Sequence, residues 1–399
     1  MELFKAHKNW AQRPVDERFS TIDEMYNFCS SYKSNSKSHF YSLKNMRAMV
    51  DSNDENEVVI NGVTDKPMKT THWAFGQLCA KANAPASYLR TLPADLTVKC
   101  LNLGFDRALK EKTIDSTLWE NSSPEDQQAL VYQPDGSILA RAFLTWRYKR
   151  IWNADVIERL QVLLDQGWQI PPARPAFPNQ PGTRPATEDD IIKGSMFSLS
   201  IKIGDLIAPA GLCASDRDMF AFLVDPNHYI DQGGEKLFRG MFVDNSEVGA
   251  SSIGLTTFYW RHICGNLIVW GAENVKVMRH KHMGEVNSIF DTEFESWVHN
   301  YQNSSIAKDT EYINAAKKTI LGDTLEDIVD TVASKRIKLG KRLLESAYVT
   351  ATQHPEDGNP HSIWGIFNGL TRVSQEIGYM DERLKIDRNA AELMKLISI

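Results

Sequence analysis

The amino-acid sequence predicts an α+β protein in which a central, mostly antiparallel sheet is flanked by N-terminal and C-terminal helices. Helical periodicity dominates both ends of the chain, and short β-branched and aromatic segments fill its middle. Strands do not alternate with helices as they would in a parallel α/β fold. With 399 residues, of which 42% are hydrophobic and 24% charged, the chain can bury a sizeable core.

Residues 1–135 are predicted to form a helical region that packs on the sheet. A helix is expected over Ile22–Tyr32, with Ser20 and Thr21 as its caps, and the polar segment SYKSNSKSHF that follows is expected to be a loop. In THWAFGQLCAKANAPASYLRTLP the apolar residues fall near helical spacing and the prolines interrupt the pattern. This segment therefore predicts two short core helices.

Residues 136–284 are predicted to form the β-rich core. The segment ILARAFLTWRYKRI alternates like a strand, and a helix follows that begins at an Asn153 cap and ends before Gly167. The proline-rich segment 171–187 is expected to be an irregular loop that could act as a mobile lid. Antiparallel strands are then expected in FSLSIKIG, MFAFLVD, KLFRGMFVD, SIGLTTFYW and NLIVWG, with DPNHYIDQGGE as turn material.

Residues 285–399 are predicted to be helical. The segment SIFDTEFESWVHNY has helical spacing, and Thr324 with Asp327 forms a capping pattern in DTLEDIVD.

Composition indicates the cellular compartment and the kinds of partner that we expect for the chain. The N-terminus lacks the basic start and apolar run of a secretory signal, and no run of about 18 apolar residues could span a bilayer, so we expect a cytoplasmic protein without a membrane partner. The five cysteines, which are odd in number and never spaced as CxxC, are expected to be reduced and mostly buried: Cys29, Cys79, Cys100, Cys213 and Cys264. A net charge of −6 disfavours binding to duplex DNA through the overall field, although it leaves room for a local basic groove.

Four segments of the chain, in order, resemble the phage and plasmid protein family labelled domain of unknown function 932. They are WAFGQLCAKANAPASYLRTLP, ASDRDMFAFLVD, RGMFVDNSEVGASSIGLTTFYWRHICGNLIVWGAENV and IWGIFNGLTRV. The resemblance covers most of the chain and implies a setting on a mobile element in a bacterial host cell. It implies no reaction and no catalytic residue.

Two polar clusters follow or precede apolar strands and could carry metal chemistry. Asp216 and Asp218 lie in SDRD just before MFAFLVD, and Asp244 and Glu247 lie in VDNSEVG. If these carboxylates converge, they could hold a divalent metal ion for a phosphodiesterase or related hydrolase. The alternative is that they form ion pairs and turns that fix the strand ends.

The segment RHKH offers a weaker metal candidate. His280 and His282 are two residues apart in a predicted strand, so both would face one side, with Glu285 near by. They could equally face solvent or an anion. Cys264, close to Arg261 and His262, could be a nucleophile with a lowered pKa, but a cysteine in an apolar strand is more often buried and inert.

The segment LARAFLTWRYKRIWN mixes cations with flat rings, as proteins that bind single strands do. As a strand it would place Trp146, Tyr148 and Arg150 on one face and Arg147 and Lys149 on the other. The candidate nucleic-acid-binding residues are Arg141, Trp146, Arg147, Tyr148, Lys149 and Arg150. The alternative is an edge strand with one packed aromatic face.

The leading hypothesis is a non-enzymatic mobile-element protein that binds single-stranded DNA during recombination, replication or establishment in the host and could form a homo-oligomer. No phosphate-cradling glycine loop and no GxGxxG motif is present, so no nucleotide cofactor is expected. One alternative is the metal-dependent hydrolase described above. Another is a protein-binding inhibitor of a host defence system, for which the acidic balance and the ten tryptophans would provide contact surface.

Overall fold

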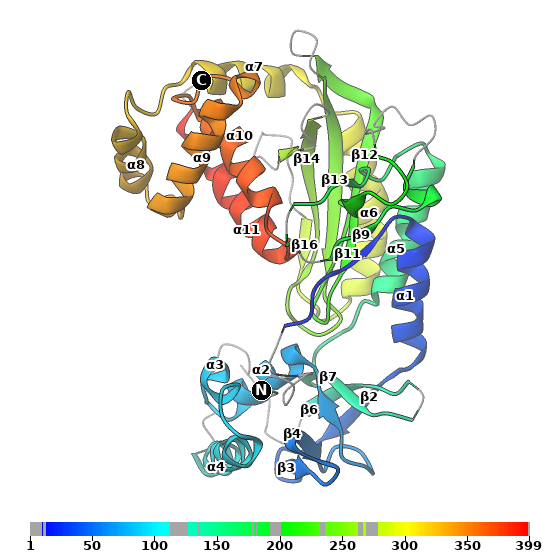
Figure 1. Ribbon diagram of the computed structural model, residues 1–399. Helices are drawn as coiled ribbons and strands as arrows, with labels where there is room; N and C mark the ends of the chain where they lie inside the picture. The colour runs from blue at the N-terminus through cyan, green and yellow to red at the C-terminus, as the bar shows by residue number, and fades with distance from the viewer. Residues whose placement is uncertain are drawn as a thin grey trace.

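The chain folds into a large lobe and a small lobe (Figure 1). In this computed structural model the described residues are 10, 13–111, 127–134, 136–177, 179–180, 182–191, 201–231, 236–261, 266–268 and 278–397. The small lobe comprises the described residues between 36 and 145, and the remaining described elements belong to the large lobe.

A seven-stranded sheet forms the centre of the large lobe, and all of its described pairings are antiparallel. Its strands run in the order β1 (Glu17–Phe19), β11 (Leu212–Ala214), β12 (Met219–Asp231), β13 (Lys236–Asn245), β14 (Ile253–Arg261) and β15 (Asn266–Ile268), and β16 (Met278–His280) also pairs with β14. The predicted α+β class, with helices from both ends of the chain around a mostly antiparallel sheet, is confirmed.

Helices cover both faces of this sheet. On one face Met219, Ala221 and Leu223 of β12 belong to the core formed with α1 (Ile22–Ser34), α5 (Asn153–Asp165) and α6 (Val286–Gln302). On the other face the alternate residues Phe220 and Phe222 pack with Met380 and Leu384 of α11 (Met380–Ala391). A strand that is buried on both faces needs apolar residues at every position, which explains the continuous apolar run MFAFLV.

Arg239 of β13 ties helix α6 to the sheet. Its side chain is buried and its guanidinium donates to the carbonyl oxygens of Tyr301, Gln302 and Ser304 at 2.8, 2.9 and 2.6 Å. These carbonyls lie at the C-terminal end of α6, where the helix leaves acceptors without intrahelical partners and where a cation complements the helix dipole.

The remaining C-terminal helices pack mainly on one another. They are α7 (Ala307–Lys318), α8 (Leu325–Ser334), α9 (Lys341–Gln353) and α10 (Ile363–Gln375), with short 3₁₀ turns at Pro355–Asp357 and Glu392–Leu396. Trp364 and Phe367 of α10 share a core with Leu237 and Tyr259 of the sheet. The predicted capping pattern at Thr324 is confirmed, because Thr324 and Asp327 form a capping box at the start of α8.

The small lobe contains a sheet as well as helices, whereas the sequence predicted a helical region over residues 1–135. Its sheet has the order β2 (Ser36–Tyr41), β6 (Gln127–Tyr132), β7 (Leu139–Thr145) and β5 (Lys69–Thr70), and β3 (Arg47–Asp51) pairs with β4 (Asp54–Asn61). The helices are α2 (His72–Lys81), α3 (Ala86–Leu89) and α4 (Ala94–Glu111), so the two predicted short helices are confirmed. Trp10 stacks on Phe75 in this core, with ring centroids 4.5 Å apart.

The polar segment SYKSNSKSHF is not a loop. It contains the end of α1 and most of β2, which is an edge strand with exposed polar residues in its middle. Edge strands tolerate such residues because one side of the strand is left open to solvent. The capping prediction for α1 is confirmed at Thr21, which forms a capping box with Glu24.

Two further predictions in the β-rich region need correction. Part of the proline-rich segment forms β8 (Arg174–Pro175) and β9 (Arg184–Pro185), which pair with opposite sides of β10 (Leu206–Ala208), and a 3₁₀ turn follows at Glu188–Asp190. Proline is tolerated there because β8 and β9 are edge strands. The expected turn after Asp225 is instead a bulge, since β12 continues to Asp231. The first half of the predicted strand FSLSIKIG, residues 197–200, lies outside the described residues, and residues 201–204 are not in a strand.

None of the helices in the described part of the chain combines the length and apolar character needed to cross a bilayer. Cys29, Cys79 and Cys213 are buried, Cys100 is exposed, and Cys264 lies outside the described residues. Burial raises the pKa of the Cys79 thiol to about 12, so this thiol is inert at neutral pH.

The contact between α9 and α10 provides a test of the packing. A Cβ atom added at Gly369 would lie 2.2 Å from the carbonyl oxygen of Ala347. We expect Gly369→Ala to lower the free energy of unfolding by about 1–3 kcal/mol, although alanine is the better helix former, because α9 must shift. Gly340→Ala is the control, since an added Cβ there meets no atom within 4 Å. Equal stability of the two variants in urea denaturation would contradict the described packing.

Candidate functional site

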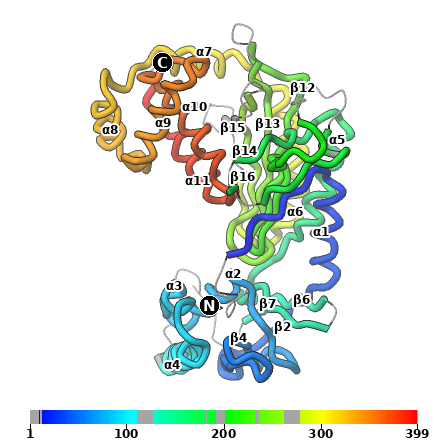
Figure 2. Tube along the Cα trace, viewed as in Figure 1, coloured from blue at the N-terminus to red at the C-terminus, as the bar shows by residue number. Residues whose placement is uncertain are grey.

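The segment from Trp146 to Trp152 connects the two lobes. Strand β7 ends at Thr145, Trp146 and Arg147 form a turn, and the chain then runs irregularly into α5 of the large lobe (Figure 2). The prediction of a strand over this segment is therefore wrong beyond Thr145, and its residues do not alternate between two faces. We call Trp146–Trp152 the linker.

The linker and α2 are held by the loop that follows β13, Ser246–Ala250, which we call the docking loop. The carbonyl oxygen of Val248 accepts hydrogen bonds from Nε1 of Trp73 at 3.0 Å and Nε2 of Gln77 at 2.9 Å. The hydroxyl of Tyr148 donates to the carbonyl oxygen of Ser246 at 2.5 Å. Nε of Arg150 donates to the carbonyl oxygen of Glu247 at 2.9 Å. The docking loop thus contacts both the small lobe and the linker.

Glu247 forms the buried centre of this contact. Its carboxylate is 2.8 Å from Nη1 of Arg141 on β7 and accepts a hydrogen bond of 2.8 Å from the backbone N–H of Asn153. Both ionic side chains are almost inaccessible, at 6% for Arg141 and 1% for Glu247. Arg141 is therefore an internal ion-pair partner and not a surface contact for nucleic acid.

The start of α5 also differs from its prediction. Asn153 is the first helical residue and does not cap the helix. Its side-chain oxygen instead accepts a hydrogen bond of 2.8 Å from Asn245. The Glu247 carboxylate takes the place of the cap, in a position where a negative charge complements the helix dipole.

The other three candidate carboxylates also have separate partners. Asp216 accepts a hydrogen bond of 3.0 Å from the backbone N–H of Trp73, and so links the large lobe to the start of α2. Asp218 accepts from the hydroxyl of Ser215 at 2.7 Å, and burial raises its pKa to about 7. Asp244 pairs with Arg279 at 2.6 Å. The predicted convergence on a metal ion is not observed, and the described residues contain no group of three potential ligands.

The two histidines of RHKH also point to different partners. A ring nitrogen of His280 lies 2.9 Å from the carboxylate of Glu293. His282 lies beyond the end of β16, stacks on Tyr148 with ring centroids 4.9 Å apart, and donates from Nδ1 to the carbonyl oxygen of Lys149 at 3.1 Å. Burial lowers the pKa of His282 to about 4. The shared-face prediction is therefore wrong, and the two rings do not form a metal site.

A cavity of about 630 Å³ lies where α2, β7 and the docking loop meet. Residues of both lobes line it: His72, Trp73, Gly76, Gln77, Ala80, Arg90, Phe143, Leu144 and Thr145 from the small lobe, Tyr148 from the linker, and Arg217, Gly249 and Ala250 from the large lobe. Its walls are mainly aromatic and aliphatic, with two arginines among them. The sequence singled out Tyr148, and it singled out SDRD, which contains Arg217, for another role. It missed Trp73, His72 and Arg90, because separate parts of the chain supply them.

Two arginines line this cavity, with the Asp216 carboxylate acting on both of them. Arg90 donates from Nη2 to the carbonyl oxygen of His72 at 2.8 Å. Arg217 lies 5.7 Å from the centre of the Trp73 ring and pairs with Asp381 at 2.6 Å. Burial, followed by the charges of Arg90 and Arg217, lowers the pKa of His72 to about 4, so this imidazole is neutral at physiological pH. In the described structure, Nδ1 of His72 and Nε of Arg217 are buried without a hydrogen-bond partner.

The exposed part of the linker lies next to this cavity. Trp146 is 45% exposed, and the guanidinium of Arg147 lies 5.4 Å from the centre of its ring. Lys149 is exposed as well. Because Thr145 and Tyr148, on either side of the turn, both line the cavity, the turn lies at its edge.

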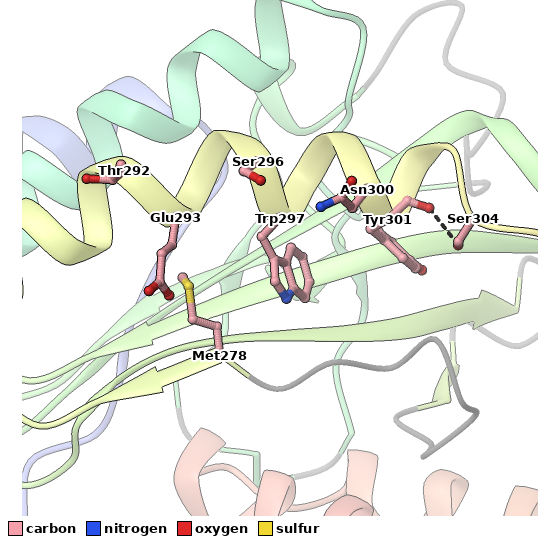
Figure 3. Close-up of a pocket in the computed structure, with 8 residues that line it drawn as sticks. All are labelled: Met278, Thr292, Glu293, Ser296, Trp297, Asn300, Tyr301 and Ser304. Atoms are coloured by element: carbon pink, nitrogen blue, oxygen red, sulfur yellow. Dashed lines mark hydrogen bonds between the residues drawn. The ribbon is translucent and has the colours of Figure 1, made fainter.

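A second cavity, of about 340 Å³, lies along α6 (Figure 3). Trp297 and Glu293 of α6 point toward it, and Met278 of β16 closes one side. Its described lining residues include no lysine or arginine, and the Glu293 carboxylate is already paired with His280. This cavity is thus a poorer candidate for an anionic ligand than the one between the lobes.

Comparison of the chain with protein-family models, with curated proteins and with solved structures finds no match.

The buried pair of Arg141 and Glu247 can be tested by a double-mutant cycle. We expect Glu247→Gln and Arg141→Met each to lower the free energy of unfolding by about 3–5 kcal/mol, because each leaves a buried charge without its partner. The double variant should lose less than the sum of the two. Lys149→Ala, an exposed linker position, is the control and should cost less than about 0.5 kcal/mol. Strictly additive losses would show that the two side chains do not interact.

The depressed pKa of His282 predicts acid sensitivity. Its folded-state pKa of about 4 lies below the ordinary value of 6.5, so between these values the unfolded chain binds more protons and stability falls as the pH falls. Asp218, with its pKa raised to about 7, acts in the opposite direction below that pH. His282→Asn, which keeps a donor for Lys149, should remove up to about 1.4 kcal/mol of this loss per pH unit. If the free energy of unfolding changes with pH in the same way in wild type and in His282→Asn, the lowered pKa of His282 is contradicted.

Proposed function

We propose that this chain binds single-stranded nucleic acid at the junction between its lobes. The contact surface is the turn of Trp146 and Arg147, with the nearby Lys149, together with the adjacent cavity. The observation that carries the proposal is the exposed Trp146, with the half-buried Arg147 against its ring, beside a cavity that is itself lined by aromatic and cationic side chains.

The chemistry of the turn suits a flexible strand. An exposed tryptophan offers a flat face on which any base can stack, and neighbouring cations contact the phosphates. Within the described part of the chain no carboxylate pairs with Arg147 or Lys149, so both charges are available to a phosphate. Because the net charge of the chain is −6, binding must rely on such a local arrangement and not on the overall field.

The other residues predicted to bind nucleic acid make internal contacts that hold the linker in place. Arg141 is paired with Glu247, Tyr148 is fixed between Ser246 and His282, and Arg150 donates to the docking loop. These residues position the linker, and we expect truncating them to affect stability before binding.

The resemblance to the phage and plasmid family supports a mobile-element setting in the bacterial cytoplasm. In that setting, single strands arise during recombination, replication and entry into a host. Binding of such a strand requires no cofactor. We do not propose the metal-dependent hydrolase, because its four candidate carboxylates have separate partners.

The turn can be tested with a labelled single-stranded oligonucleotide of roughly 20 nucleotides, a length that exceeds common site sizes. Trp146→Ala should weaken binding by about 1–3 kcal/mol through lost stacking. Arg147→Ala should reduce the slope of log K against log salt by about 0.7. Fluorescence anisotropy over a salt series measures both effects.

Matched controls are available at exposed positions on other elements. Leu103→Ala on α4, at a residue that is 70% exposed, and Lys341→Ala at the start of α9 should bind like wild type. No binding by the wild type at low salt would refute the proposed function. Unchanged binding by both turn variants would remove the turn from the contact surface.

A further inference from the structure

The cavity between the lobes has the size and wall chemistry of a site for one small ligand. Its volume of about 630 Å³ falls in the range of 300–1,000 Å³ that is usual for ligand sites. The space exists because small residues line it where the two lobes approach each other, namely Gly76 and Ala80 on α2 and Gly249 and Ala250 on the docking loop. Larger side chains at these positions would fill it.

The polar groups of the cavity favour an anionic ligand. Arg90 and Arg217 reach its wall, and Nε of Arg217 is buried without a hydrogen-bond partner in the described structure. In the described part of the chain Arg217 forms an ion pair with Asp381, which is shared with Arg13, and the Asp216 carboxylate also acts on Arg217 and Arg90. A bound anion would satisfy the unused Nε donor of Arg217.

The apolar walls favour a ligand in which a planar ring system is attached to the anionic group. Trp73 and Tyr148 contribute their rings, and hydrogen bonds to the docking loop fix both side chains. Rings that are held in this way lose little further entropy when a planar ligand stacks on them. Nδ1 of His72, which is also buried without a partner, offers a neutral polar contact for such a ligand.

We propose that this cavity binds one nucleoside monophosphate unit, with its base against Trp73 and Tyr148 and its phosphate on Arg217 and Arg90. The unit has two possible sources, a free mononucleotide or one nucleotide of a bound strand. The second source rests on the proposed function. The first does not depend on it.

Isothermal titration calorimetry with deoxyadenosine 5′-monophosphate tests the site. We expect binding at least about tenfold tighter than that of inorganic phosphate or of deoxyadenosine, since each of these lacks one half of the contact, and tenfold corresponds to about 1.4 kcal/mol. Arg217→Gln should weaken the monophosphate at least about tenfold and leave deoxyadenosine unchanged. Equal binding of the monophosphate and inorganic phosphate would overturn the proposal.

Filling the cavity tests its location. Ala250→Phe on the docking loop should weaken the monophosphate at least about tenfold, and Ala80→Phe, at an exposed position of α2, does the same from the opposite lobe if the first variant does not fold. Leu103→Ala is the control and should bind like wild type. A folded filled variant with unchanged affinity would overturn the proposal.

Competition with an oligonucleotide separates the two sources and the two proposals. If saturating monophosphate weakens strand binding, a nucleotide of the strand occupies the cavity. If both bind without competition, the cavity takes free mononucleotides. Strand binding without any monophosphate binding overturns this inference and leaves the proposed function intact. Monophosphate binding without any strand binding refutes the proposed function and leaves the cavity as a nucleotide site.

Discussion

The arrangement of the two lobes depends on the buried contact of Glu247 with Arg141 and the first turn of α5. Glu247 lies on the docking loop of the large lobe, Arg141 on β7 of the small lobe, and Asn153 where the linker enters α5. Three separate parts of the chain thus meet at one carboxylate. Because neither charge is accessible to water, loss of either partner would strand the other in a medium of low dielectric constant. The pair therefore fixes the path of the linker more strictly than an apolar contact of the same size would.

This constraint also creates the candidate site. Backbone carbonyls of the docking loop hold Trp73, Gln77 and Tyr148 in place, and the small residues Gly249 and Ala250 keep the loop from filling the space between the lobes. Ligand sites often occur at such junctions, since a domain interface can leave a concave apolar surface without disturbing either core. Here the same junction carries an exposed tryptophan and two cations on its rim, so the cavity and the turn can act on one ligand.

The sequence predicted the individual helices and strands better than the contacts between them. The apolar runs of β12, β13 and β14 and the capping boxes at Thr21 and Thr324 were sufficient to locate the main strands and helices. The linker was mistaken for a strand because alternating aromatic and basic residues look the same in a strand and in an extended connection. VDNSEVG was correctly singled out as a polar cluster after a strand, but its chemistry was not foreseeable, because the arginine that pairs with Glu247 lies on a distant strand. His72 and Arg90 carry no local signal, and Arg217 was singled out only as part of the SDRD cluster, since only the docking of the lobes brings the three to one cavity.

The proposed function requires that a single strand contact the protein at the lobe junction. Photochemical crosslinking of a strand that carries 5-iododeoxyuridine, followed by mass spectrometry of the crosslinked peptides, tests it without any substitution in the protein. We expect crosslinks to the peptide that contains Trp146 and Tyr148, with a second group at Trp73 if a base enters the cavity. Crosslinks confined to the helices between Ala307 and Ala391, with none at the linker or α2, would contradict it.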